Sequence, residues 1–187
     1  MKKRKIVIIR GKTTGGKSTI SYELAKVLPN WIFIDLWKIK EMFQPLGLKD
    51  YVTSNKASKK AVMSIMKEVM RAERTNIVLQ ESTQSSLKKS LKADLKKYNY
   101  DIYSIFLDVE LKDAIKRDIK REKPTMGVNK KGLPNDEWKK KGNQPKKGDF
   151  TINTSHQNMK DVINSILKHI GEKEEKHPKK HLIRKSW

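Results

Sequence analysis

The feature that most constrains the fold is a glycine-rich segment near the start of the 187-residue chain. Residues 11–18 read Gly-Lys-Thr-Thr-Gly-Gly-Lys-Ser, which fits GxxxxGK[ST] at every position. An apolar run, 5–10, precedes it, and a helical pattern from Lys17 to Leu28 follows. Glycine lets a loop turn so that backbone N–H groups converge on phosphate oxygens, and the helix N-terminus adds a positive dipole end. We therefore predict a nucleotide-binding loop, the alternative being a turn that binds nothing; its residues are Gly11, Lys12, Thr13, Thr14, Gly15, Gly16, Lys17, Ser18 and Thr19.

Apolar residues alternate between strand-like runs and helical spacing along the chain. Strand-like runs occur at 5–10, 31–35, 76–80, 102–109 and 150–153. Helical spacing occurs at 17–28, 38–43, 57–74, 87–95, 111–121 and 159–170. We expect a capping box of Thr154 and Gln157 to begin the last helix. Strands alternating with helices predict a three-layer α/β/α domain with a five-stranded parallel sheet covered on both faces.

Two segments lack this pattern. Residues 122–148 contain three prolines and four glycines without a sustained period, and loops this long are typical of functional lids or disorder. Residues 172–187 are rich in charge and are expected to form a flexible basic tail. We therefore predict one domain over 1–171, with a lid at about 122–148 and a C-terminal tail.

Charge and cysteine content limit the classes of function. The chain has 43 Lys and Arg against 21 Asp and Glu, a formal charge of +22, which favours a polyanionic partner such as nucleic acid, unless it reflects only a lysine-rich composition. The absence of cysteine excludes disulfides, thiolate metal sites and thiol nucleophiles. The basic start is followed by only four apolar residues, Ile6 to Ile9, too few for a signal peptide or a membrane span. We expect a cytoplasmic protein with no membrane partner.

Two carboxylates at predicted strand ends are candidates for phosphoryl-transfer chemistry. In open α/β sheets ligands bind beyond the carboxyl ends of the strands, where Asp35 and Glu81 follow the second and third strands. Transfer to an alcohol needs a carboxylate that accepts the hydroxyl proton and another that steadies Mg²⁺, directly or through water. We predict Asp35 as the base and Glu81 on the metal side, the alternative for each being a helix cap or a surface ion pair. Asp108, after the fourth strand, is expected to form a cap or a salt bridge.

Basic and hydroxyl side chains complete the candidate site. Lys17 would bridge the β- and γ-phosphates, and the Ser18 hydroxyl would reach Mg²⁺. Arg117 and Arg121 lie four residues apart before the predicted lid, and therefore on one helix face. We predict that they clamp the migrating phosphoryl group, the alternative being a solvated basic face, since lysines flank both of them.

These residues resemble those of small P-loop kinases of the polynucleotide 5′-hydroxyl kinase, chloramphenicol phosphotransferase and zeta-toxin group. The likeness covers roughly 5–170, and it includes the strand end Gln80-Glu81, where an Asp is commoner in the group. The resemblance implies a nucleoside-kinase-like P-loop NTPase fold. It also implies that Asp35 is the base, that Glu81 lies near Mg²⁺ and the acceptor, and that the arginines at 117 and 121 hold phosphates.

The sequence thus predicts a kinase that uses ATP and Mg²⁺ and transfers the γ-phosphate to a hydroxyl group. The charge and the resemblance together favour the 5′-hydroxyl of DNA or RNA as the acceptor. A small molecule, such as a nucleoside or an antibiotic-like alcohol, is the alternative acceptor. A second alternative is a nucleotide-dependent nucleic-acid-binding protein without kinase chemistry.

Overall fold

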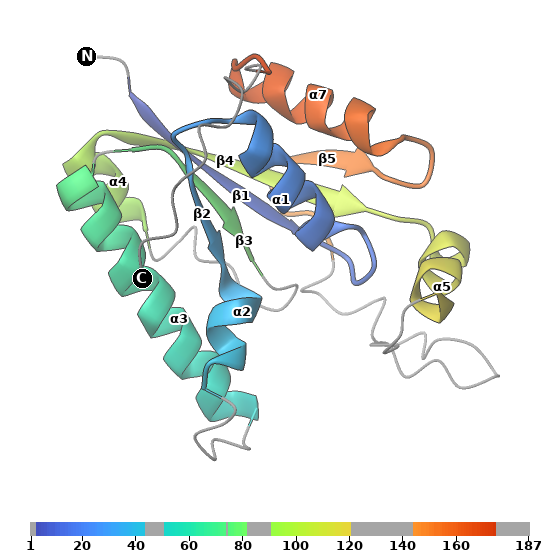
Figure 1. The fold of residues 1–187 in the computed structure, drawn as a ribbon, viewed down its shortest axis with the longest axis horizontal. Helices are drawn as coiled ribbons and strands as arrows, with labels where there is room; N and C mark the ends of the chain where they lie inside the picture. Colours follow the sequence, from blue (N-terminus) through green and yellow to red (C-terminus); the bar gives the residue numbers. More distant parts are fainter. Residues whose placement is uncertain (1–2, 44–50, 74, 82–90, 121–143, 175–187) are drawn as a thin grey trace, which may run out of the picture.

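A five-stranded parallel sheet forms the centre of the protein, as the sequence predicts. The computed structural model describes residues 3–43, 51–73, 75–81, 91–120 and 144–174. The strands pair in the order β2-β3-β1-β4-β5, with every pair parallel (Figure 1). Their bounds are β1 (Arg4–Gly11), β2 (Ile32–Asp35), β3 (Ile77–Gln80), β4 (Tyr100–Asp108) and β5 (Asp149–Asn153).

Helices connect the strands and cover both faces of the sheet. The described helices are α1 (Lys17–Val27), α2 (Leu36–Glu41), α3 (Tyr51–Glu68), the π-helical turn η1 (Val69–Glu73), α4 (Lys92–Tyr98), α5 (Leu111–Ile119) and α7 (Met159–Ile170). The core of one face joins the sheet to α1 and α7, and the core of the other joins it to α2 and α3. Helix α5 lies beyond the carboxyl end of β4 (Figure 1). The predicted three-layer α/β/α architecture is therefore confirmed.

The uninterrupted apolar sequence of the central strand, β1, is explained by its burial on both faces of the sheet. Side chains alternate across a strand, so Val7 and Ile9 face α1 and α7 while Ile6 and Ile8 face the opposite core. All four are fully buried. A strand covered on both faces needs apolar residues at consecutive positions.

The last helix begins later than its predicted cap. Asn158 caps α7, with its side chain accepting a hydrogen bond of 3.0 Å from the N–H of Asp161. The Thr154 hydroxyl instead donates to the carbonyl oxygen of Asp108 at 2.9 Å. The predicted capping box at Thr154 and Gln157 is wrong, because the Thr154 hydroxyl forms its hydrogen bond with the end of β4 instead.

The predicted lid and tail fall mostly outside the described residues. Of the lid, the structure describes 144–148, and of the tail it describes 172–174. The residues after the lid are anchored to the sheet through Asp149, which contacts the Arg10 guanidinium and accepts a hydrogen bond from Ser104. The Arg10 and Asp149 side chains are only 3% and 2% exposed, so this ion pair is buried.

Within the described parts of the chain, no helix has both the length and the apolar character needed to cross a membrane.

Candidate nucleotide-binding site at the strand ends

The loop between β1 and α1 depends on glycine at two positions. Gly11 has a φ of 147°, and a Cβ there would collide with the backbone of Leu107 in β4. Gly16 has a φ of 87° and immediately precedes α1. The N–H of Lys12 donates to the carbonyl oxygen of Leu107 at 3.1 Å. The predicted strand–loop–helix unit is therefore present, and the loop lies directly against β4.

Thr14 holds the middle of the loop in a strained conformation. Its φ is 62°, in the left-handed region that β-branched residues rarely adopt, and it is 4% exposed. Its hydroxyl donates to the carbonyl oxygen of Thr13 at 2.6 Å. Such backbone strain persists where surrounding contacts enforce it, and it concentrates at functional sites.

The Lys17 side chain folds back over this loop. Its ammonium donates to the carbonyl oxygens of Gly11 at 3.0 Å and Lys12 at 2.8 Å. The Lys12 ammonium forms an ion pair of 2.7 Å with Asp108, which confirms the expected salt bridge of that acid. A positive charge is thus held at the N-terminal end of α1, where the helix dipole also favours an anion.

The Ser18 hydroxyl, in the first turn of α1, accepts a hydrogen bond from Gln80, a residue that the sequence did not predict as part of the site. The Gln80 side-chain N–H donates to Ser18 Oγ at 3.0 Å. Gln80 is 5% exposed, and its amide oxygen, Oε1, has no hydrogen-bond partner among the described residues. Its position could have indicated this contact, because Gln80 shares the strand face of Val78, which packs in the α1 core.

Asp35 lies beside Gln80 at the carboxyl edge of the sheet. The two residues are in register between β2 and β3, so their side chains leave the sheet on the same face. Oδ1 of Asp35 accepts hydrogen bonds from the N–H groups of Trp37 at 2.8 Å and Lys38 at 3.3 Å. The capping alternative for Asp35 is therefore confirmed, while its role as a base stays a prediction. The cap bonds use one carboxylate oxygen.

Glu81 follows Gln80 and is 1% exposed. Its N–H donates to the carbonyl oxygen of Ile9 at 3.0 Å, which continues the pairing of β3 with β1. Glu81 lies one residue past the end of β3. The metal role of Glu81 stays a prediction, and Gln80 contacts Ser18.

Helix α2, which Asp35 caps, also contains a buried lysine. Lys40 is 4% exposed, and its ammonium lies 4.8 Å from the centre of the Trp37 ring. Burial lowers the pKa of Lys40, because removal from water disfavours the charged ammonium.

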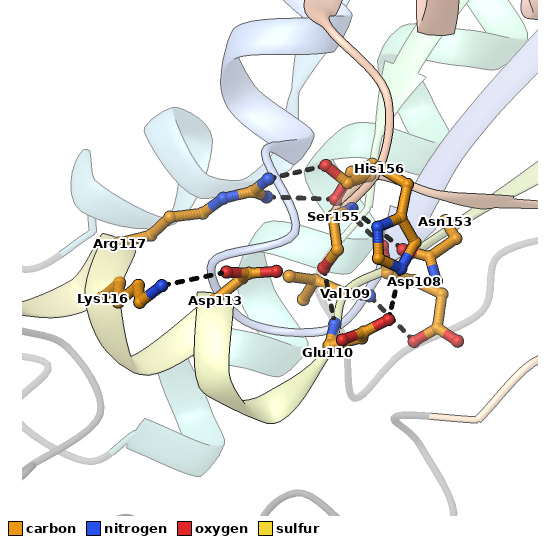
Figure 2. Close-up of polar contacts among 10 residues, drawn as sticks. Asp108, Val109, Glu110, Asp113, Lys116, Arg117, Asn153, Ser155 and His156 are labelled. Atoms are coloured by element: carbon orange, nitrogen blue, oxygen red, sulfur yellow. Dashed lines mark hydrogen bonds and ion pairs between the residues drawn. The ribbon is translucent and has the colours of Figure 1, made fainter.

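Arg117, on α5, bonds the segment after β5 (Figure 2) and also reaches the loop between β1 and α1. Its guanidinium donates to the carbonyl oxygen of Thr154 at 2.6 Å and to the Thr154 hydroxyl at 3.0 Å. It also donates to the carbonyl oxygen of Thr14 at 3.4 Å. The predicted phosphoryl clamp at Arg117 stays a prediction, and its partner Arg121 lies outside the described residues.

The connections after β4 and β5 are cross-linked beside Arg117 (Figure 2). The Glu110 N–H donates to the Ser155 hydroxyl at 2.9 Å, and the Ser155 N–H donates to the Asn153 side chain at 2.9 Å. His156 contacts the Glu110 carboxylate. These bonds fix the two connections relative to each other at the carboxyl edge of the sheet.

Comparison with known proteins finds solved structures with a similar fold. No protein-family model and no curated protein sequence matches the chain. The solved APS kinase of Mycobacterium tuberculosis, in complex with AMPPNP and APS, is similar over 92% of this chain and 100% of its own, with a TM-score of 0.62 and 13% identity. Shikimate kinase from Acinetobacter baumannii, in complex with shikimate, is similar over 88% and 92%, with a TM-score of 0.58 and 17% identity. The Deinococcus radiodurans tunicamycin resistance protein is similar over 91% and 97%, with a TM-score of 0.62 and 15% identity. The chain therefore has the α/β fold of these proteins.

Proposed function

We propose that the protein is a kinase that transfers the γ-phosphate of ATP to a hydroxyl group of a small molecule. The observation that carries this proposal is the loop of residues 11–18, with the Lys17 ammonium held over it by two carbonyl oxygens. Backbone N–H groups, a helix N-terminus and a lysine are the groups that bind nucleotide phosphates in this motif.

Oxygen ligands near Ser18 fit a magnesium ion, which prefers oxygen donors and retains several waters. The Ser18 hydroxyl is a suitable ligand, and Glu81 is the predicted carboxylate. The described residues contain no group of three or more His, Asp or Glu side chains placed to hold a metal, so most ligands would be nucleotide phosphates and waters. When bound there, Mg²⁺ would neutralise phosphate charge.

Three kinds of side chain would carry out the other parts of the phosphoryl transfer. Lys17 would stabilise negative charge on the β- and γ-phosphates. Asp35 would accept the proton of the attacking hydroxyl through the carboxylate oxygen that the cap bonds leave over. Arg117 and Arg121 remain our candidates for the clamp on the transferred group.

The acceptor is inferred from the structural relatives. APS kinase and shikimate kinase were solved with APS and shikimate, which are small molecules, and each covers most of this chain. A second candidate acceptor, the 5′-hydroxyl end of DNA or RNA, is favoured by the formal charge of +22. Binding of a nucleic acid through this charge would weaken steeply as salt rises.

Transfer of label from γ-labelled ATP tests both candidates. The full chain and its Lys17→Ala variant would be incubated with a panel of sugars, nucleosides and hydroxy acids, and separately with 5′-hydroxyl DNA and RNA oligonucleotides. We expect the intact chain to label a small alcohol and Lys17→Ala to lose at least about 10²-fold in rate, because a charge at the developing oxyanion is removed. Labelling of the oligonucleotides alone would favour the second candidate. Absence of ATP binding with Mg²⁺ by calorimetry would overturn both.

A further inference from the structure

The contact between Ser18 and Gln80 leaves one polar atom without a role. Gln80 belongs to β3 and Ser18 to α1, 62 positions apart, and the amide N–H donates to the hydroxyl oxygen at 3.0 Å. The other end of the same amide, Oε1, is buried and has no hydrogen-bond partner among the described residues. Leaving a buried acceptor unsatisfied costs about 1–3 kcal/mol, so such an atom calls for a partner that arrives with a ligand.

The hydrogen bond also determines what the hydroxyl can do. A serine oxygen has two lone pairs and one O–H. Because the Gln80 amide donates to one lone pair, the other lone pair remains for a cation, and its direction is set by the amide. A carboxylate at the same position could only accept from the hydroxyl. The amide therefore orients the oxygen of Ser18 rather than its proton.

We propose that Gln80 is a positioning residue for the metal of a bound Mg²⁺–nucleotide. It orients Ser18 Oγ towards the ion, and its free amide oxygen accepts a hydrogen bond from a water on that ion. This inference rests on the proposed function, since it needs a nucleotide site at residues 11–18. The assignment concerns Gln80 and not the next residue, Glu81, which stays the predicted carboxylate on the metal side.

A neutral amide has a consequence for how the metal binds. Gln80 contributes orientation and a hydrogen-bond acceptor, but no negative charge that would attract Mg²⁺ before the nucleotide arrives. We therefore expect Mg²⁺ to bind with the nucleotide, and the contribution of Gln80 to be visible as the ratio of nucleotide affinity with Mg²⁺ to nucleotide affinity without it.

Calorimetric titration of the full chain with AMPPNP, in EDTA and in excess Mg²⁺, measures this ratio without catalysis. In Gln80→Met, which keeps the length of the side chain but removes both hydrogen bonds, we expect the ratio to fall about 10-fold, as is typical when a partner of a metal ligand is lost. The affinity in EDTA should stay within about twofold, because the phosphates still meet the loop and Lys17. Gln80→Glu should keep the ratio at or above the original, since a carboxylate accepts from the water and also from the Ser18 hydroxyl, which leaves the lone pairs of Ser18 Oγ to the ion.

Two serines of α1 provide a matched control. Ser21 is fully buried, one turn after Ser18, and its hydroxyl has no hydrogen-bond partner among the described residues. Ser21→Ala should leave both affinities unchanged, whereas Ser18→Ala should lower the ratio. The double variant Ser18→Ala with Gln80→Met should lose less than the sum of the two single losses, because part of the effect of Gln80 passes through the serine.

The outcomes separate this inference from the proposed function. An intact chain that binds no AMPPNP in either condition overturns the proposed function. If folded Gln80→Met binds AMPPNP normally and its affinity ratio is unchanged, the role of Gln80 is overturned while the proposed function stands. The same conclusion follows if the ratio falls in Glu81→Gln but not in Gln80→Met. If Gln80→Met does not fold, Gln80→Glu decides, and a tenfold fall of its ratio would count against the proposal.

Discussion

The two flanks of the phosphate loop differ in how completely their polar groups are paired. On the β4–β5 flank, defined by Asp108, Asn153 and Thr154, all three side chains are paired. Asp108 pairs with Lys12, Asn153 accepts from the N–H of Ser155, and Thr154 bonds both Asp108 and Arg117. On the β2–β3 flank, defined by Asp35 and Gln80, the cap bonds use one oxygen of the acid, and the amide oxygen of Gln80 has no hydrogen-bond partner among the described residues. One flank braces the loop, while the other holds polar atoms that the described residues leave over.

This difference has a physical basis in preorganisation. A site stabilises a developing charge best when its dipoles are fixed before the reaction begins. The bonds from Arg117 to Thr14 and Thr154 hold the loop against β4 and β5. The atoms on the opposite flank that have no hydrogen bond among the described residues are our candidates for contact with a metal, a water or a hydroxyl. The predictions below test this division of roles.

The largest effect is expected at Asp35. Asn caps a helix as well as Asp does, but it does not accept a proton, so Asp35→Asn should lower kcat by about 10²–10⁴-fold. Its free energy of unfolding should stay within about 0.5 kcal/mol of the original, while Asp35→Ala should lose about 1 kcal/mol as well, because the cap is gone. Steady-state kinetics and urea unfolding of both variants measure this. A rate within twofold in Asp35→Asn would show that the acid serves only as the cap.

The next effect concerns the contact between the loop and β4. In Gly11→Ala the new methyl group would meet the backbone of Leu107, which cannot swing aside, so we expect a loss of about 3 kcal/mol in stability. Gly16→Ala is the matched control, because its Cβ would lie 3.8 Å from Ile20 and only the positive φ opposes it. Its loss should be about 1–2 kcal/mol. Equal losses in the two variants, measured by urea unfolding, would argue against a loop braced on β4.

Arg117 tests the braced flank itself. Arg117→Met removes the charged donors to Thr154 and should lower the free energy of unfolding by about 2 kcal/mol. Lys116→Met, one position earlier at an exposed side chain, should change it by less than about 0.5 kcal/mol. Thermal unfolding with and without AMPPNP follows both. A loss of 10³-fold or more in kcat with unchanged stability would instead support Arg117 as the phosphoryl clamp.

The smallest effect is expected at Thr14. Glycine tolerates a φ of 62° at no steric cost, so Thr14→Gly should relieve strain and raise the stability by up to about 1 kcal/mol. Combined with Arg117→Met, the gain should shrink, since the guanidinium bond to the Thr14 carbonyl helps to enforce the conformation and the threonine can relax without it. Unfolding curves of the two single variants and the double variant measure the coupling. A destabilised Thr14→Gly would mean that the threonine side chain contributes more than its strain costs.

The sequence predicted the local parts of the site better than its long-range contacts. The loop, its flanking strand and helix, and the strand-end positions of Asp35 and Glu81 follow from spacing within a few residues. Gln80 was missed because an amide at a strand end has no sequence signature of its own, and its partner Ser18 is remote in the chain. Thr154 was misassigned because a threonine before a helix resembles a cap, while the structure offers it Asp108 and Arg117 instead.

By itself, the amino-acid sequence determined the alternation of strands and helices and the turn at residues 11–18. Both depend on residues that are close in the chain, through the spacing of apolar side chains and the backbone freedom of glycine. Only the tertiary structure decided that β1 lies between β3 and β4 in the sheet. That order sets Gln80 against Ser18 and Asp108 against Lys12. Strand order depends on which distant apolar faces pack together, and no local pattern records it.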